Sequence, residues 1–145
     1  IMLYGLRPSP HVGRGVTLKP AMTLKTKISY LKQIPPGTPI SYGHTFCCDR
    51  QMLVATLPIG YADGYSRGLS NRGYAMIRNM RAPLVGRVCM DMCMFDVTGI
   101  KGIREGDDAV LFGEKPTVDE LAAQLDTINY EIVCSVGKRV PRIFL

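Results

Sequence analysis

The chain has 145 residues, which is enough for one domain with a hydrophobic core and too few for two ordinary domains. Its 18 basic and 12 acidic residues give a net charge of +6 at pH 7, and the basic residues are dispersed between Arg7 and Arg142. Positive charge that is dispersed in this way favours a small anionic ligand or ordinary solubility. It argues against a continuous stripe of basic residues that binds nucleic acid.

The breaker residues indicate the fold class. Fifteen Gly and ten Pro interrupt many short apolar runs, whereas helical spacing of apolar residues is scarce. This composition predicts a mostly β domain with a little helix. For the whole chain we expect an antiparallel β-barrel-like domain with one or two short helices near the C-terminus.

The cysteine and histidine content limits which disulfides and metal sites the chain can form. Five cysteines are an odd number, and the two histidines lack ligand spacing. We therefore expect neither a disulfide framework nor a metal site, and we expect a reduced, cytoplasmic chain. No apolar stretch is long enough to cross a bilayer, so a membrane is not an expected partner.

The N-terminal third predicts a connection followed by strands. Ile1–Leu6 begins within an apolar run, which suggests a fragment, and within residues 1–20 the stretch Arg7–Pro20 contains too many Pro and Gly residues for regular structure. We expect these residues to connect a missing domain to this one. Ala21–Leu31 alternates apolar and polar residues, as a half-buried antiparallel strand does. Pro39–Phe46 is expected to form a short strand that ends near Tyr42 and Gly43.

The central stretch has the strongest features of a site. An apolar run, Met52–Ile59, ends in Gly60–Gly64, where two glycines bracket Tyr61 and Asp63. Glycine tolerates positive φ and close backbone approach, so a buried strand can present these side chains and Arg67 to a cavity. A hairpin whose tyrosine packs on the rim of the sheet explains the same residues equally well.

The next region predicts further strands. Tyr74–Ile77 is expected to pair with Ala82–Val88 across Arg78–Arg81. Met92–Val97 and Ala109–Phe112 are expected to be strands as well.

The C-terminal region is the only one with helical signals. Thr117 and Glu120 match the capping-box pattern at the start of a first helix. A second helix is expected from Asn129 to Gly137, with the glycine in the left-handed conformation. Lys138–Leu145 is expected to be a closing strand.

Candidate chemistry centres on tyrosine. Two histidines without a nucleophile motif make a Ser-His-Asp triad improbable. Tyr42, Tyr61 and Tyr130 each lie at the end or start of an element, although most tyrosines in such places serve packing. A phenol has a pKa of about 10, so a tyrosine base needs a nearby cation. Arg67 and Arg87 are available for this role.

Five ordered motifs carry a family resemblance. They are Ile1–Leu6, Ser41–Gly43, Leu57–Gly64, Gly86–Asp91 and Asn129–Glu131. Together they make the chain resemble the C-terminal domain of alanine racemase, from the first residue to Arg142.

The resemblance implies a pyridoxal 5'-phosphate enzyme that interconverts L- and D-alanine, the latter a component of peptidoglycan. It implies an N-terminal α/β barrel that makes most of the contacts with the cofactor and carries the cofactor lysine. That barrel is absent from this chain, so we expect the chain alone to be inactive. Its expected partners are its own barrel and a second copy in a homodimer.

The resemblance also assigns catalytic and substrate roles. Tyr42 matches the second base, which faces the cofactor lysine across a planar carbanion and acts in the partner's barrel. Met90 matches a residue whose backbone N–H binds the substrate carboxylate, and Tyr61 matches a residue on the substrate side of the active site. Arg87 and Arg67 match residues that line the entrance to the active site.

Two further residues match the cofactor phosphate. Tyr130 matches a tyrosine that contacts this phosphate, and Ile1 matches a residue whose backbone N–H binds it.

Two alternative functions remain open. One is a racemase that prefers serine or accepts many amino acids. The other is a stand-alone β-barrel binding module, for example for nucleic acid, which the positive net charge would attract.

Overall fold

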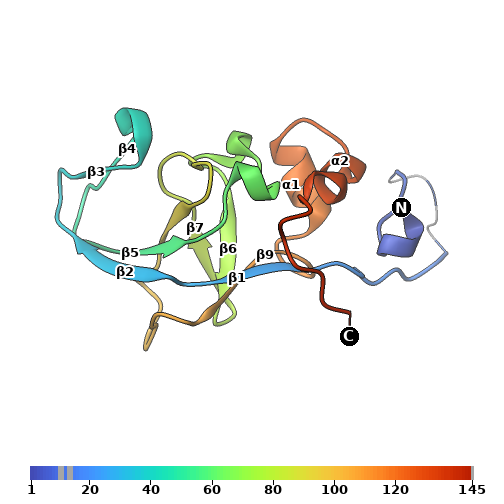
Figure 1. The fold of residues 1–145 in the computed structure, drawn as a ribbon, viewed down its shortest axis with the longest axis horizontal. Helices are drawn as coiled ribbons and strands as arrows, with labels where there is room; N and C mark the ends of the chain where they lie inside the picture. Colours follow the sequence, from blue (N-terminus) through green and yellow to red (C-terminus); the bar gives the residue numbers. More distant parts are fainter. Residues whose placement is uncertain (10–11, 13–14, 145) are drawn as a thin grey trace.

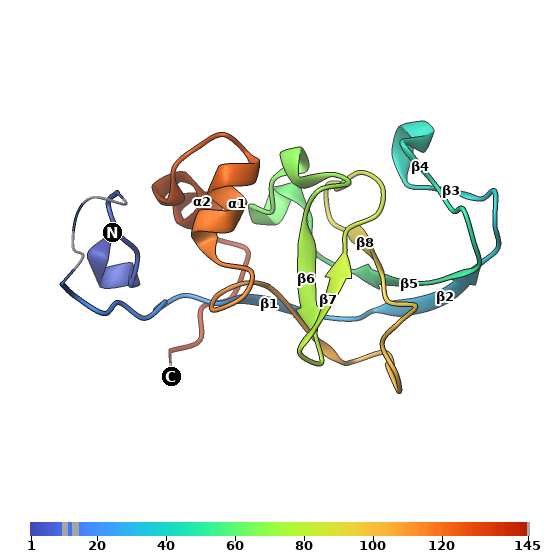
Figure 2. The same ribbon diagram turned by 180° about the vertical axis from the view of Figure 1, so that it is seen from behind.

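A computed structural model describes residues 1–9, 12 and 15–144, and it is mostly β, as predicted (Figures 1 and 2). Its elements in chain order are the 3₁₀ helix η1 (Met2–Tyr4), β1 (Leu24–Lys27), β2 (Tyr30–Ile34), β3 (Pro39–Ile40), η2 (Tyr42–His44), β4 (Phe46–Cys47), β5 (Met52–Leu57), η3 (Tyr61–Asp63), η4 (Arg67–Leu69), β6 (Tyr74–Ile77), β7 (Met80–Pro83), β8 (Cys93–Asp96), β9 (Asp108–Phe112), α1 (Val118–Gln124) and α2 (Asn129–Ser135).

The strands form antiparallel sheets around a main hydrophobic core, and a smaller second cluster includes Ile40 of β3 and Met52 of β5. One sheet has the order β1-β9-β6-β7, a second has the order β2-β5-β8, and β3 pairs with β4. A bridge between Leu84 and Phe95 joins the two larger sheets on one side, and the chain runs from β1 into β2 on the other. The arrangement is therefore barrel-like, and the fully buried Leu57, Ile77 and Phe95 lie in its core.

The prediction of a single half-buried strand over Ala21–Leu31 is wrong in two respects. Its alternation holds at Leu24 and Ile28, which are buried, but Tyr30 is 54% exposed. The chain also changes partner within this stretch, because β1 pairs with β9 whereas β2 pairs with β5. Periodicity reports which face is buried, and it carries no information about which strand supplies the hydrogen bonds.

Two other predicted strands are also corrected. Pro39–Phe46 is a small hairpin, since β3 and β4 pair and the helical turn η2 joins them. The hairpin of β6 and β7 turns at Arg78 and Asn79, both at positive φ. A two-residue turn of this kind matches the twist of the strands, so β7 begins inside the stretch predicted as a loop.

The helices begin as predicted, and the C-terminus differs. Thr117 Oγ1 accepts from the Glu120 N–H at 3.1 Å, which completes the capping box of α1. Gly137 has no positive φ, because α2 already ends in extended backbone at Val136. Residues 138–144 form no strand, and the Arg142 guanidinium donates to the Val136 carbonyl at 2.8 Å instead.

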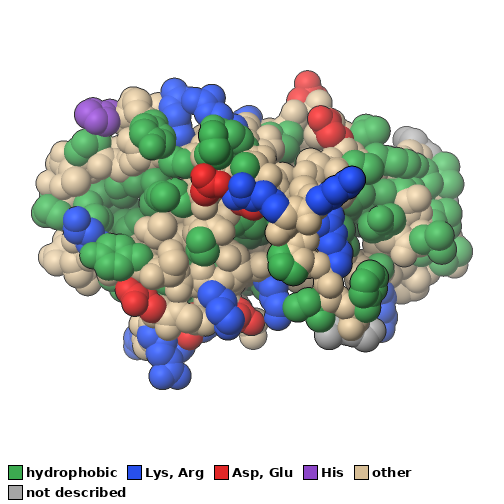
Figure 3. Space-filling model, viewed as in Figure 1, with side chains coloured by type: hydrophobic (Ala, Val, Ile, Leu, Met, Phe, Trp, Pro, Cys, Tyr) green, Lys and Arg blue, Asp and Glu red, His purple; other side chains and the backbone are tan. Residues whose placement is uncertain are grey.

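The N-terminal segment lies at one end of the molecule, beyond the two helices, and the β3–β4 hairpin lies at the other (Figures 1 and 2). Hydrophobic side chains gather at the N-terminal end (Figure 3), where Leu3 is 95% exposed. Positions 10, 11, 13 and 14 of the predicted connection, and position 145, lie outside the described residues. No helix among the described residues is long and apolar enough to span a membrane.

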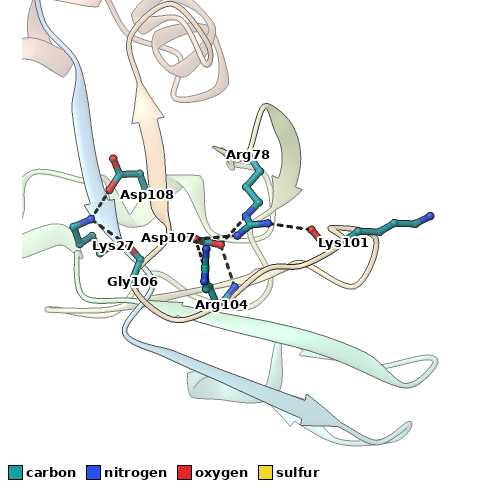
Figure 4. A network of polar contacts seen from close by, with 7 residues as sticks. All are labelled: Lys27, Arg78, Lys101, Arg104, Gly106, Asp107 and Asp108. Atoms are coloured by element: carbon teal, nitrogen blue, oxygen red, sulfur yellow. Dashed lines mark hydrogen bonds and ion pairs between the residues drawn. The ribbon is translucent and has the colours of Figure 1, made fainter.

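An ion-pair network fixes the turn before β9 (Figure 4). The Arg78 Nε donates to Asp107 Oδ2 at 2.8 Å, and the Arg104 backbone N–H donates to the same oxygen at 3.0 Å. The hydrogen bonds from Arg78 and Arg104 lower the pKa of Asp107 below its ordinary value. The network therefore joins the β6–β7 turn to the segment that enters β9.

We expect Asp107→Asn to reduce the acid sensitivity of the fold. Because the folded-state pKa of Asp107 lies below the unfolded value, its carboxylate stabilises the fold above about pH 4 and loses this effect as the pH falls further. Urea unfolding at several pH values measures the difference. A pH profile for Asp107→Asn that is identical to that of the wild type would contradict the assignment.

We expect Tyr65→Phe to stabilise the protein by about 1 kcal/mol, because an unpaired buried hydroxyl is costly. Tyr65 is 2% exposed, its hydroxyl has no hydrogen-bond partner within the described chain, and burial raises its pKa. Thermal unfolding provides the measurement. Tyr74→Phe is the matched control and should destabilise the fold slightly, because the Tyr74 hydroxyl donates to Glu120 at 3.0 Å. A less stable Tyr65→Phe variant would show that the hydroxyl has a partner.

Candidate active site

Tyr42 lies at the tip of the β3–β4 hairpin and is 74% exposed. Its neighbours Ser41 and Gly43 have φ angles of 66° and 70°, so the turn is tight and presents the ring outward. The Ser41 hydroxyl donates to the Arg87 carbonyl at 2.8 Å, and the Asn71 amide donates to Thr45 Oγ1 at 3.2 Å. The turn is thus held by two loops from elsewhere in the chain.

The turn after β5 shows the close backbone approach that its glycines predict. A Cβ atom added at Gly60 would lie 2.2 Å from the Cys89 carbonyl oxygen and 2.4 Å from that of Met90. This contact lets the Tyr61 N–H donate to Cys89 and the Ala62 N–H donate to Met90, each at 3.0 Å. Gly60 therefore aligns the segment that carries Tyr61 with the segment that carries Met90.

The loop that carries Asn71 also supports the segment that follows β7. The Gly86 N–H donates to Asn71 Oδ1 at 2.6 Å, and the Asn71 N–H donates back to the Gly86 carbonyl at 3.1 Å. Farther along, the Val88 N–H donates to the Ser70 hydroxyl at 3.0 Å. These bonds fix the backbone on both sides of Arg87.

These loops line an open pocket of about 390 Å³. It brings together five residues that the sequence singled out, from four separate parts of the chain. The lining consists of Tyr42, Tyr61, Arg67, Arg87, Val88, Cys89, Met90, Asp91 and Met92. None of these is a lysine, so a lysine that reacts with a ligand here would have to come from another part of the protein.

The pocket carries positive charge. The guanidinium groups of Arg67 and Arg87 have no ion-pair partner within the described chain. Asp91 is the only carboxylate in the lining, and it is paired with Arg139. The arrangement therefore favours an anion, and a carboxylate can also accept hydrogen bonds from exposed backbone N–H groups.

The two residues predicted to contact phosphate lie outside this pocket. Tyr130 is on α2 and is 39% exposed, whereas Ile1 is partly buried against the core. Neither the Tyr130 hydroxyl nor the Ile1 nitrogen has a hydrogen-bond partner within the described residues. Both groups can therefore donate to a phosphate, which is compatible with their predicted role.

Sequence reasoning missed the contacts of Arg139. This residue pairs with Asp63 and Asp91, which lie 76 and 48 residues away along the chain. No local pattern in the sequence signals so distant a contact. All five cysteines are free, and no group of three or more metal-ligating side chains occurs in the described part of the chain.

The fold and pocket define an antiparallel β domain that carries a cationic, tyrosine-lined site. The alanine racemase, C-terminal domain family model matches residues 21–144. The chain is 54% identical to the alanine racemase of Halothermothrix orenii over 146 residues, which is 98% of this chain and 38% of that protein. It is 49% identical to that of Desulfovibrio desulfuricans, covering 100% of this chain and 39% of that one.

Solved structures agree with this match. The alanine racemase of Clostridium difficile 630 in complex with cycloserine superposes with a TM-score of 0.92 at 41% identity, over 97% of this chain and 38% of that one. The Bartonella henselae enzyme with covalently bound pyridoxal phosphate has a TM-score of 0.91 at 33% identity, over 99% and 40%. The chain belongs to the alanine racemase C-terminal domain family, and it spans about two fifths of the length of these relatives.

We expect Gly60→Ala to destabilise the domain by about 3 kcal/mol, as an added atom in a packed site does. The new Cβ would meet two carbonyl oxygens that cannot both move. Chemical unfolding gives the free energy. Gly99→Ala is the control and should change it by less than about 0.5 kcal/mol, because nothing lies within 4 Å of its added Cβ. Equal stability of both variants would contradict the close approach at Gly60.

Proposed function

We propose that the chain is the C-terminal domain of an alanine racemase that uses pyridoxal phosphate to interconvert L- and D-alanine in the cytoplasm. The observation that carries the proposal is the pocket shared by Tyr42, Tyr61, Arg67, Arg87 and Met90. The curated relatives named alanine racemase support the same activity. A stand-alone binding module is not favoured by any comparison.

Each pocket residue has a role that its position supports. Tyr42 is the base opposite the cofactor lysine, and its exposed hydroxyl can exchange a proton with the α-carbon of alanine. The Met90 N–H binds the substrate carboxylate, and Tyr61 lines the substrate side of the same pocket. Arg87 and Arg67 line the entrance and attract that carboxylate.

Pyridoxal phosphate, when bound, would supply the electron sink that makes the α-proton acidic. Most of its contacts would come from an N-terminal α/β barrel, together with the reactive lysine that the pocket lacks. From this chain, Tyr130 and the N–H of Ile1 would hold the phosphate. The exposed apolar residues Met2, Leu3 and Tyr4 support contact between this end and that barrel.

The shape of the domain supports a homodimer that shares its sites. The β3–β4 hairpin, which carries Tyr42, and the N-terminus lie at opposite ends of the molecule in both views (Figures 1 and 2), so a single domain does not bring Tyr42 to its own N-terminal end. Two copies placed head to tail about a two-fold axis would bring each Tyr42 to the N-terminal end of its partner. Such a dimer would contain two equivalent active sites.

Assay of the full-length protein with L-alanine and with L-serine tests the proposal. Racemisation of alanine is expected, and turnover of serine at a higher kcat/KM would favour the serine-preferring alternative. Absence of both activities, with pyridoxal phosphate bound, would refute the proposed function.

We expect Tyr42→Phe in the full-length protein to lower racemisation by about a factor of 100 or more, the usual contribution of a general base. The cofactor absorbance should remain, because Tyr42 does not hold the cofactor. Tyr30→Phe is the control, since Tyr30 is also an exposed tyrosine and does not line the pocket. Normal rates in both directions for Tyr42→Phe would rule out this base.

A further inference from the structure

One arginine of the C-terminal segment bridges the two turns that carry Tyr61 and Met90. The Arg139 Nε donates to Asp63 Oδ1 at 2.6 Å, and its Nη2 donates to Asp91 Oδ1. Asp63 belongs to the same turn as Tyr61, and Asp91 follows Met90 directly. A single side chain therefore joins both turns.

The Asp63 end of this ion pair is held in place by further contacts. The Asp63 side chain is 11% exposed, and its second oxygen accepts from the Gly60 N–H at 2.8 Å. The segment before Arg139 is bound to the same turn, because the Gly137 N–H donates to the Asp63 carbonyl at 2.9 Å. Moreover, the Ser135 hydroxyl donates to the Gly64 carbonyl at 3.0 Å. The turn after β5 thus lies between the end of α2 and the Met90 loop.

The same pairing has an electrostatic effect on the pocket. Asp91 is the only carboxylate among the lining residues, whereas Arg67 and Arg87 form no ion pair with any of the described residues. Without a partner, the Asp91 carboxylate would lie one residue from Met90 and would repel an incoming carboxylate. Arg139 neutralises this charge.

We propose that Arg139 is a positioning residue for substrate binding. It holds the Tyr61 and Met90 turns together, and it neutralises Asp91, so that the pocket presents a net positive field to a carboxylate. The inference rests on the proposed function, because it takes the substrate carboxylate to bind beside Met90.

Kinetics of the full-length enzyme test the electrostatic part. Arg139→Gln should raise KM for L- and D-alanine by about tenfold, with a much smaller loss of kcat, as the loss of ground-state binding requires. Adding Asp91→Asn to this variant should lower KM again to within about threefold of wild type, because the exposed negative charge is gone. A KM that stays high in the double variant would overturn the electrostatic role.

Two further variants make the test robust. Arg139→Lys keeps the charge and remains informative if the glutamine variant does not fold; its KM should rise by less than about threefold. A rise as large as tenfold would overturn the role of charge. Arg78→Gln is the matched control, because Arg78 also pairs with an aspartate and does not line the pocket, so it should leave KM unchanged.

Hydrogen exchange of the full-length protein tests the structural part independently of activity. In Arg139→Gln, the amides of residues 60–64 and 89–92 should exchange at least about fivefold faster, whereas in Arg78→Gln they should not change. Unchanged exchange and unchanged KM in Arg139→Gln would overturn the proposal. If the wild-type enzyme does not racemise alanine, the proposed function fails, whereas the exchange experiment still decides whether Arg139 joins the two turns.

Discussion

The site depends on one close contact between two stretches of backbone. Gly60 lies so near the carbonyl groups of Cys89 and Met90 that no side chain fits between them. The contact allows two backbone hydrogen bonds at 3.0 Å, and these fix the relative positions of Tyr61 and Met90. Backbone contacts hold a site more rigidly than flexible side chains do, because fewer torsions can relax.

The charged side chains are arranged so that the two arginines in the pocket have no carboxylate partner within the described chain. Several arginines that do not line the pocket pair with aspartates, as Arg78 does with Asp107 and Arg139 does with Asp91. Arg67 and Arg87 have no such partner within the described chain, although they lie in the pocket. Exposed ion pairs contribute little to stability, so the main effect of this distribution is on which ligands the pocket attracts.

Local signals predicted the fold class and many of its elements. The capping box placed the start of α1 at Thr117, and the apolar run from Met52 placed β5. Local signals failed where pairing decided the outcome: Ala21–Leu31 divides between two sheets, and Lys138–Leu145 forms no strand over its described residues. Strand partners depend on contacts between distant residues, which periodicity does not encode.

The sequence by itself determined which residue types could serve the site, and its ordered motifs indicated the family. It also placed Tyr42 and Tyr61 at element ends, because glycines and apolar runs mark such positions. Only the tertiary structure decided that these residues share one pocket, and that Arg139 joins its two turns. The reason is physical: a pocket is formed by side chains that meet across long stretches of chain, and their meeting depends on how the sheets pack.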